Sequence, residues 1–152
     1  MSYKLNWILK KFDELTVTEL YNILHLRSEV FVVEQNCAYQ DVDNKDPLTY
    51  HLMGWEQNNL VAYTRIIPPG ISYKYPSIGR VSTANSVRRT GVGKQLMQLS
   101  ITHCENLFVN LPIQIGAQLY LKKFYESFDF HQTSDIYLED GIEHIEMIKN
   151  NL

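Results

Sequence analysis

The stretch VRRTGVGKQLMQL, residues 87–99, sets two arginines, two glycines and a lysine directly in front of an apolar helical pattern. It follows SIGRVSTA (77–84), whose alternating apolar residues favour a strand, so we predict a strand, a basic turn and a helix. Glycine lets the backbone approach a ligand, and a helix N-terminus offers free N–H groups and a positive dipole end. We therefore predict an anion site in this turn, rather than two solvated surface arginines.

The glycine spacing narrows the kind of anion site. A P-loop would need glycine at position 88 and serine or threonine at position 95, where this chain has Arg88 and Gln95. A dinucleotide fingerprint would need three glycines and an acidic residue about 20 positions further on. The missing P-loop residues argue against a nucleotide hydrolase. The pattern that remains is R-x-x-G-x-G, carried by Arg88, Gly91 and Gly93.

The rest of the pattern predicts a single α/β (α+β) domain over residues 1–152, in the order β-α-β-β-β-α-β-α-β-β. The strand-helix-strand order around the basic turn implies one parallel pair, while hairpins at Asn58–Asn59 and Asp140–Gly141 make the sheet mixed and mostly antiparallel. The expected strands cover residues 3–9, 51–57, 60–67, 77–84, 112–117, 131–138 and 143–149. Three helices are expected. The first follows a capping box of Thr16 and Glu19 and places Leu20, Ile23, Leu24 and Phe31 on one face. The other two cover residues 91–106 and 118–128.

Composition bounds the class of protein. The 152 residues are 45% hydrophobic and 20% charged with a net charge of −3, which fits one globular domain and argues against a coat for nucleic acid. No apolar run approaches the roughly 20 residues of a membrane helix, and the N-terminus has no signal-peptide layout. Cys37 and Cys104 form no CxxC pair and the five histidines show no ligand spacing, so we expect no metal and a cytoplasmic location. Cys104 falls on the apolar face of its helix and is expected to be a core thiol.

Several blocks of the chain carry a family resemblance. The R-x-x-G-x-G turn between a strand and a long helix resembles motif A of the GNAT superfamily of N-acetyltransferases, and FYESFDF (124–130) is similar to its closing helix with a tyrosine. LRSEVFVVEQNCAYQDVD (26–43), GAQLYLKKFYESFDF (116–130) and EDGIEHIEM (139–147) resemble the ElaA-type branch. The chain departs from the family pattern at Asp129, where most members have glycine, and at Gln118, where many have asparagine.

The resemblance implies acetyl-CoA as a cosubstrate, held by a sheet that splays between its fourth and fifth strands. Its pyrophosphate would lie on the amides of residues 89–94, its pantetheine along strand residues 81–83, and Gln118 near the pantetheine arm. The CoA-binding residues expected in this way are Val81, Ser82, Thr83, Arg88, Arg89, Thr90, Gly91, Val92, Gly93, Lys94 and Gln118.

Catalytic roles follow from the same resemblance. Tyr125 lies on an apolar helical stripe, where a core tyrosine is the alternative, but the family places this hydroxyl beside the CoA sulfur as a general acid. A general base is also needed, since an alkyl ammonium must lose a proton before it attacks; Glu34 is the first candidate, acting through water, ahead of His51 and Glu29. Arg27 falls on an apolar face and needs a carboxylate, and pairing with Glu34 rather than Asp41 would make Glu34 an anchor.

The expected reaction is transfer of an acetyl group to a primary amine by direct attack on the thioester. The acceptor pocket is expected between the loops 34–50 and 68–76, with Cys37, Tyr39, Tyr73 and Tyr75 lining or rimming it. A small-molecule amine and a protein lysine both remain open as acceptors, and the terminal hairpin could pair across a homodimer. The alternative function is a CoA-binding regulatory module without catalysis.

Overall fold

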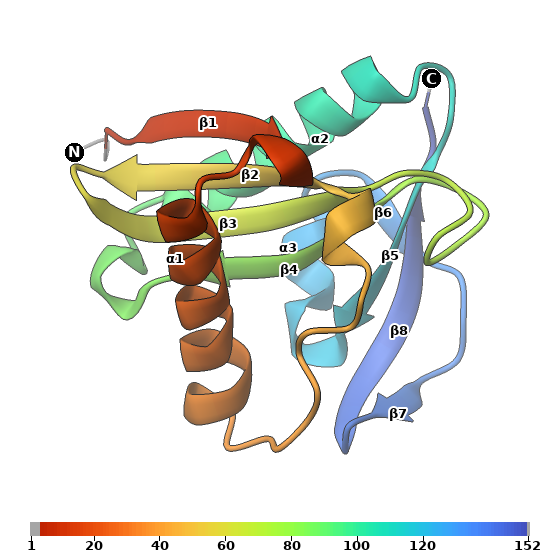
Figure 1. Cartoon of the computed structure of the whole chain (residues 1–152). Helices are drawn as coiled ribbons and strands as arrows, with labels where there is room; N and C mark the ends of the chain where they lie inside the picture. Colours follow the sequence, from red (N-terminus) through yellow and green to blue (C-terminus); the bar gives the residue numbers. More distant parts are fainter. Residues whose placement is uncertain (1–3, 152) are drawn as a thin grey trace.

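A β-sheet divided into two four-stranded halves, with helices packed against it, forms the protein (Figure 1). The computed structural model describes residues 4–151. The first half-sheet holds β1 (Asn6–Lys11), β2 (Tyr50–Glu56), β3 (Asn59–Ile67) and β4 (Ser77–Thr83), and the second holds β5 (Ile113–Gln118), β6 (Phe130–Gln132), β7 (Tyr137–Glu139) and β8 (Ile142–Lys149). The α-helices are α1 (Val17–Arg27), α2 (Val92–Leu107) and α3 (Lys122–Glu126).

Strands β4 and β5 begin side by side and then separate (Figure 1). Gln114 N donates to Pro76 O at 3.0 Å where both strands begin, and no ladder joins the two strands within residues 4–151. Because α2 returns the chain to the same end, β4 and β5 leave that end in parallel, whereas every pair inside each half is antiparallel. The predicted mixed, mostly antiparallel sheet with a splay between its fourth and fifth strands is therefore confirmed.

Helix α1 begins at the predicted capping box. Glu19 N donates to Thr16 Oγ1 at 3.0 Å, and Thr16 N donates to the Glu19 carboxylate at 2.8 Å, so two otherwise free helix donors are satisfied. The helix continues after Arg27 as a π-helical segment, Ser28–Glu34, which extends it to the start of the following loop. Of the predicted face, Ile23 is buried, together with Leu26 and Arg27, while the expected Leu20, Leu24 and Phe31 are half-buried.

Helix α2 buries the predicted stripe against the sheet. Leu96, Met97, Ile101 and Cys104 have 2% or less of their surface exposed. Burial raises the pKa of the Cys104 thiol to about 12, so this cysteine is a neutral core residue, as predicted. Gly93 is only half-buried because it lies in the open first turn of the helix.

The C-terminal half departs from two predicted boundaries. The single strand expected over 131–138 is two short strands, β6 and β7, because Ser134 Oγ accepts the Glu146 amide and interrupts the ladder. The helix expected over 118–128 is a 3-10 turn, Leu119–Leu121, followed by the short α3.

Turn geometry confirms the predicted last hairpin, shows the left-handed turn at Asp129 and corrects the position of the β2–β3 turn. Asp140 and Gly141 have φ of 50° and 78°, as the predicted hairpin requires, and Asp129 has φ of 70°, the left-handed region that favours glycine. The β2–β3 turn is formed by Gln57 (φ 54°) and Asn58, one residue before the expected Asn58–Asn59, because Asn59 already pairs with Glu56.

Candidate active site

The splay between β4 and β5 opens a cavity of about 160 Å³, which we call the cleft. Residues from β4, β5, α3, β8 and the end of the first helix line it. They include Val30, Phe31, Gln35, Cys37, Tyr39, Val81, Gln118, Tyr125 and His144. A second hollow of about 410 Å³ adjoins it and shares Tyr39, Arg80 and Gly116 with the cleft.

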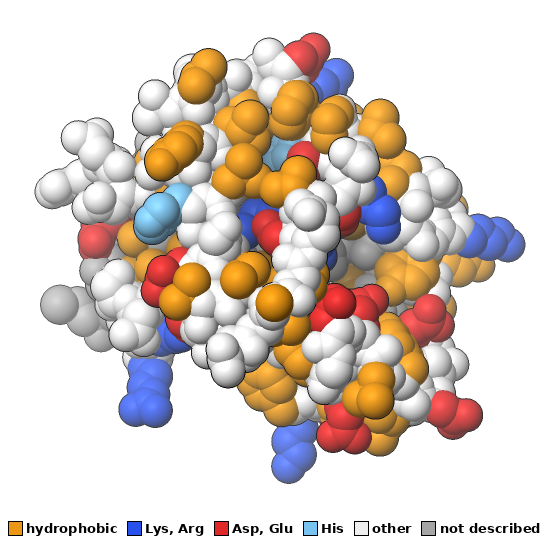
Figure 2. All heavy atoms as spheres, turned by 60° about the horizontal axis from the view of Figure 1, so that its bottom comes forward, with side chains coloured by type: hydrophobic (Ala, Val, Ile, Leu, Met, Phe, Trp, Pro, Cys, Tyr) orange, Lys and Arg blue, Asp and Glu red, His pale blue; other side chains and the backbone are white. Residues whose placement is uncertain are grey.

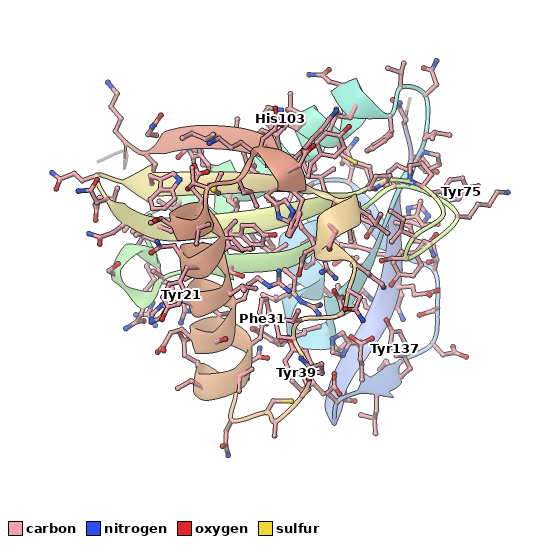
Figure 3. The ribbon with its side chains drawn as sticks, in the orientation of Figure 1. Tyr21, Phe31, Tyr39, Tyr75, His103 and Tyr137 are labelled. Atoms are coloured by element: carbon pink, nitrogen blue, oxygen red, sulfur yellow. The ribbon has the colours of Figure 1, made fainter. Side chains whose placement is uncertain are left out.

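Figure 2 shows the molecule turned so that the bottom of Figure 1 faces the reader. It shows acidic and basic side chains close together in the middle of this face, with hydrophobic side chains around them. Figure 3 shows Phe31, Tyr39 and Tyr137 around the opening between α1 and β8 on the same side.

Tyr125 is the most buried hydroxyl group of the cleft. It lies on α3 with 6% of its surface exposed, and the rings of Phe124 and Phe130 meet it edge-on at centroid distances of 5.2 and 6.1 Å. Burial, with a smaller contribution from Tyr120, raises the pKa of Tyr125 well above its ordinary value. The phenol therefore stays protonated at neutral pH and can donate a proton or a hydrogen bond inside the cleft.

The basic turn leads into α2 through backbone amides that no helical hydrogen bond uses. Arg89 and Gly91 have φ of 64° and 91°, and the first helical bond runs from Gln95 N to Gly91 O at 3.1 Å. The amides of Val92, Gly93 and Lys94 therefore lack helical acceptors. A Cβ placed on Gly91 or Gly93 would meet no heavy atom within 4 Å, so the approach to these amides is open.

Arg88, the first residue of the motif, turns back toward β4 and the first helix. Its guanidinium donates to Glu34 Oε2 at 2.6 Å and to Thr83 O at 2.9 Å. Glu34 ends the π-helical segment, and neither Arg88 nor Glu34 is among the residues that line the cleft. The contact favours Glu34 as an anchor. Its partner is Arg88, whereas the sequence had suggested Arg27.

Strand β4 carries a β-bulge beside the cleft. Arg80 and Val81 together stand opposite Thr64, because Tyr63 pairs with Ser82 and Arg65 pairs with Gly79. Arg80 has φ of 53°, unusual for a non-glycine residue, and Ser82 Oγ donates to Arg80 O at 2.8 Å. No periodicity in the sequence marks this bulge.

A closed ring of three arginines and three aspartates holds the bulge in place. Arg27 pairs with Asp41 (2.9 Å) and Asp46 (2.7 Å), which confirms Asp41 as its partner rather than Glu34. Arg80 binds Asp41 at 2.8 Å and Asp43 at 3.4 Å. Arg65 closes the ring at 2.8 Å from Asp43 and 3.0 Å from Asp46. The ring fixes the acidic loop segment DVDNKD (41–46) against α1, β3 and β4.

The wall of the cleft at Gln35 and Gln118 is polar. Gln118 and Gln35 exchange two amide hydrogen bonds of 3.0 and 3.3 Å, so the residue expected near pantetheine binds the end of the first helix in this structure. Beside them, the hydroxyl groups of Tyr73 and Tyr137 lie over Gly116, where a Cβ would come within 2.7 and 3.1 Å of them.

Comparison with known proteins places this geometry in a family. Residues 13–151 match the family described as acetyltransferase (GNAT) domain. The chain belongs to the GNAT family. It is 42% identical to Protein ElaA of Escherichia coli over 148 residues, covering 95% of this chain and 96% of that protein.

Solved GNAT structures agree with the fold. The E. coli ElaA crystal structure superposes with a TM-score of 0.91 at 40% identity, covering 97% of this chain and all of that one. An acyl-CoA N-acyltransferase from Pseudomonas aeruginosa gives 0.92 at 40% identity, covering 96% and 99%. A Bacillus subtilis acetyltransferase in complex with CoA gives 0.69 at 19% identity, covering 98% and 100%, and shares the fold.

Three other residues that the sequence suggested for the site lie outside the cleft. His51 is fully buried with Nδ1 2.7 Å from the Tyr63 hydroxyl and Nε2 3.0 Å from Asp46 O, and burial lowers its pKa, so it is a core residue. Glu29 is exposed on the first helix. Tyr75 was expected to line or rim the acceptor pocket; it lines neither cavity and lies far from Tyr39 in Figure 3.

Two further features bear on possible ligands. Among residues 4–151, no cluster of three or more histidine, cysteine or acidic side chains is arranged to hold a metal ion. In the same part of the chain, no helix combines the length and the apolar character that crossing a bilayer requires.

Proposed function

We propose that this GNAT protein transfers an acetyl group from acetyl-CoA to a primary amine by direct attack on the thioester. The observation that carries the proposal is the buried, protonated hydroxyl of Tyr125 in the cleft where β4 and β5 separate. A phenol in that position has an evident chemical use, because a thiol near pKa 8.5 leaves poorly as a bare thiolate in a dry site.

The chain offers suitable contacts for each part of acetyl-CoA. The amides of residues 89–94 suit the pyrophosphate, since those of Val92, Gly93 and Lys94 lack helical acceptors and Arg89 and Lys94 are exposed beside them. Within residues 4–151, the edge of β4 at 81–83 carries no ladder toward β5, so the backbone groups that face β5 suit pantetheine amides. Thr83 O is an exception, because it already accepts from Arg88. The Bacillus subtilis relative with bound CoA supports this proposal at the level of the fold.

The same strand edge suits the tetrahedral intermediate. Attack on the thioester places a negative charge on the carbonyl oxygen, and backbone N–H groups of residues 81–83 would stabilise that oxyanion. Tyr125 then donates to the departing sulfur, so no covalent acetyl-enzyme is needed. Cys37 lines the cleft, but its thiol lies 3.4 Å from Asp140 O and has no role in this proposal.

Glu34 keeps a place in the proposal as a water-mediated base or as the anchor of Arg88, and the 2.6 Å contact supports the anchor. The acceptor is proposed to enter from the adjoining hollow, where the carboxylates of Glu139 and Asp140 suit contact with a cationic amine, although Lys45, Arg65 and Arg80 also line it. The two free thiols suit a reducing compartment, and we propose the cytoplasm.

The test is release of CoA thiol from acetyl-CoA across a panel of primary amines, with wild-type protein and two variants. Tyr125→Phe is expected to lower kcat at least tenfold while leaving the Kd for acetyl-CoA nearly unchanged. Tyr21→Phe, on the exposed face of α1, is the matched control and should retain full turnover.

Unchanged turnover in Tyr125→Phe would contradict the catalytic role. Acetyl-CoA binding by a wild-type protein that is inert toward every amine would instead support the non-catalytic CoA-binding module. Failure to bind acetyl-CoA at all would overturn the proposal as a whole.

A further inference from the structure

His144 is a titratable group of the cleft that no expectation from the sequence had used. It lies on β8 opposite Gln118 of β5 and Tyr137 of β7, and 7% of its surface is exposed. Its ring stacks on Tyr137 at a centroid distance of 5.8 Å and an angle of 26°. The histidine is therefore held in one orientation at the wall of the cleft.

The contacts of His144 define its tautomer. Nδ1 lies 2.7 Å from Ile142 O, and a carbonyl oxygen only accepts, so Nδ1 carries the hydrogen. In the neutral ring, Nε2 then keeps its lone pair and can accept a proton. Glu139 Oε2 lies 3.5 Å from Nε2, close enough to stabilise the imidazolium that would form.

His144 and Tyr125 approach the cleft from opposite faces of the second half-sheet. Ala117 and Ile145 pair across β5 and β8 and belong to the apolar cluster that contains Tyr125. The next pair, Gln118 and His144, points to the other face, because side chains alternate along a strand. The cleft passes through the splay, so both groups line it.

We propose that His144 is the general base of the reaction and that Glu139 supports it; this inference rests on the proposed function. A neutral acceptor amine forms the bond to the acyl carbon, the C–S bond breaks, and its electron pair goes to sulfur. Nε2 of His144 takes one proton from the nitrogen while the Tyr125 hydroxyl gives one to sulfur. Proton exchange with water restores both groups, and the net reaction of an ammonium ion with acetyl-CoA releases one proton.

The arrangement separates the two proton transfers in space. The acceptor side has His144, Glu139 and the Tyr73–Tyr137 pair, whereas the sulfur side has Tyr125 alone in an apolar setting. Glu34, by contrast, already binds Arg88 outside the cleft lining. Geometry therefore favours His144 over Glu34 as the group that receives the proton.

Other titratable and charged groups share the surroundings of His144. They come from the loop, β4, the 3-10 turn Leu119–Leu121, α3, β7 and the hairpin turn, and they are Cys37, Tyr39, Arg80, Tyr120, Tyr125, Tyr137, Glu139 and Asp140. Arg80 is already paired with Asp41 and Asp43, so its charge is compensated within the ring. Glu139 is the carboxylate that contacts the histidine, and its side chain is 62% exposed, so its effect is screened.

The test compares His144→Asn with His131→Asn, an exposed histidine on β6, as the matched control. The probes are acetyl-CoA and whichever amine the wild type turns over fastest in a panel of polyamines, lysine peptides and amino sugars. His144→Asn is expected to lower kcat/KM for the amine about 100-fold, mainly through a fall in kcat. Acetyl-CoA affinity and far-UV circular dichroism should match the wild type, which separates a catalytic loss from misfolding.

Two further measurements keep the inference falsifiable. Glu139→Gln should lower kcat for the amine a few-fold and leave acetyl-CoA affinity unchanged, since the imidazolium that forms loses its carboxylate. In the full wild-type chain, ring ¹⁵N chemical shifts of His144 should show the Nδ1–H tautomer.

An Nε2–H tautomer, or kcat/KM within about threefold of wild type in His144→Asn, overturns the inference. A loss of about 100-fold in Glu34→Gln together with near wild-type kcat/KM in His144→Asn assigns the base to Glu34 instead. A wild-type chain inert toward the whole panel contradicts the proposed function, and the tautomer then still tests the geometry of the site.

Discussion

Replacing Asp46 with asparagine should lower the free energy of unfolding more than the same substitution at an exposed aspartate. Asp46 Oδ1 accepts from Arg27 Nη1 at 2.7 Å and from Arg65 Nη1 at 3.0 Å, and its side chain is 6% exposed. Burial alone would raise the pKa of Asp46, but the hydrogen bonds and charges of the two arginines outweigh it and the pKa lies below its ordinary value. The carboxylate is therefore a charged, integral member of the ring.

The expected loss follows from these contacts. A charge-assisted hydrogen bond contributes about 1.5–3 kcal/mol, and removing one partner of a buried ion pair costs about 3–5 kcal/mol. Arg27 is fully buried and would keep only Asp41, so we expect Asp46→Asn to lower the free energy of unfolding by about 3 kcal/mol. That corresponds to a fall in Tm of about 10 °C for a domain of this size.

Urea unfolding followed by circular dichroism measures this loss, with Asp13→Asn as the exposed control, expected within about 0.5 kcal/mol of wild type. Because the folded pKa of Asp46 is depressed, its contribution is present above the ordinary value of 3.8 and is lost as pH falls below it. The difference between Asp46→Asn and wild type should therefore shrink in acid. A loss under about 1 kcal/mol at pH 7 would refute the reasoning that the ring fixes the loop.

Further predictions concern the turns and the thiols. Asp129→Gly should raise the free energy of unfolding by about 0.5–1 kcal/mol in the same assay, since φ of 70° strains any side chain; a loss would contradict this. Gly91→Val should raise the Kd for acetyl-CoA at least tenfold by calorimetry, because a branched side chain would cover the open amides at φ of 91°, and equal affinity would show that CoA binds elsewhere. A thiol reagent at pH 8 should modify Cys37 quickly and Cys104 only after unfolding; rapid modification of both in the native protein would contradict the buried thiol.

Local signals in the chain were sufficient for much of the fold. The Thr16–Glu19 box set the start of α1, Asp140–Gly141 set the last hairpin, and the apolar stripe of α2 set its buried face. These succeed because each depends on contacts within a few residues. Boundaries failed where distant groups intervened, as at 131–138, where Ser134 takes the amide of Glu146.

The candidate site divides in the same way. Residues 89–94 and Tyr125 were indicated by the sequence because a glycine-rich turn and a helical stripe are local patterns, and the family resemblance gave them roles. Those roles stay proposals that the experiments above test.

What the sequence determined by itself is the set of elements and the open turn, since helix caps, glycines and apolar periods act over short stretches of chain. Only the tertiary structure decided that Arg88 binds Glu34, that three arginines and three aspartates close a ring, and that His144 shares a cleft with Tyr125. The physical reason is that ion pairs and shared cavities depend on distances between segments far apart in the chain. Those distances are set by how the two half-sheets separate, which no local pattern encodes.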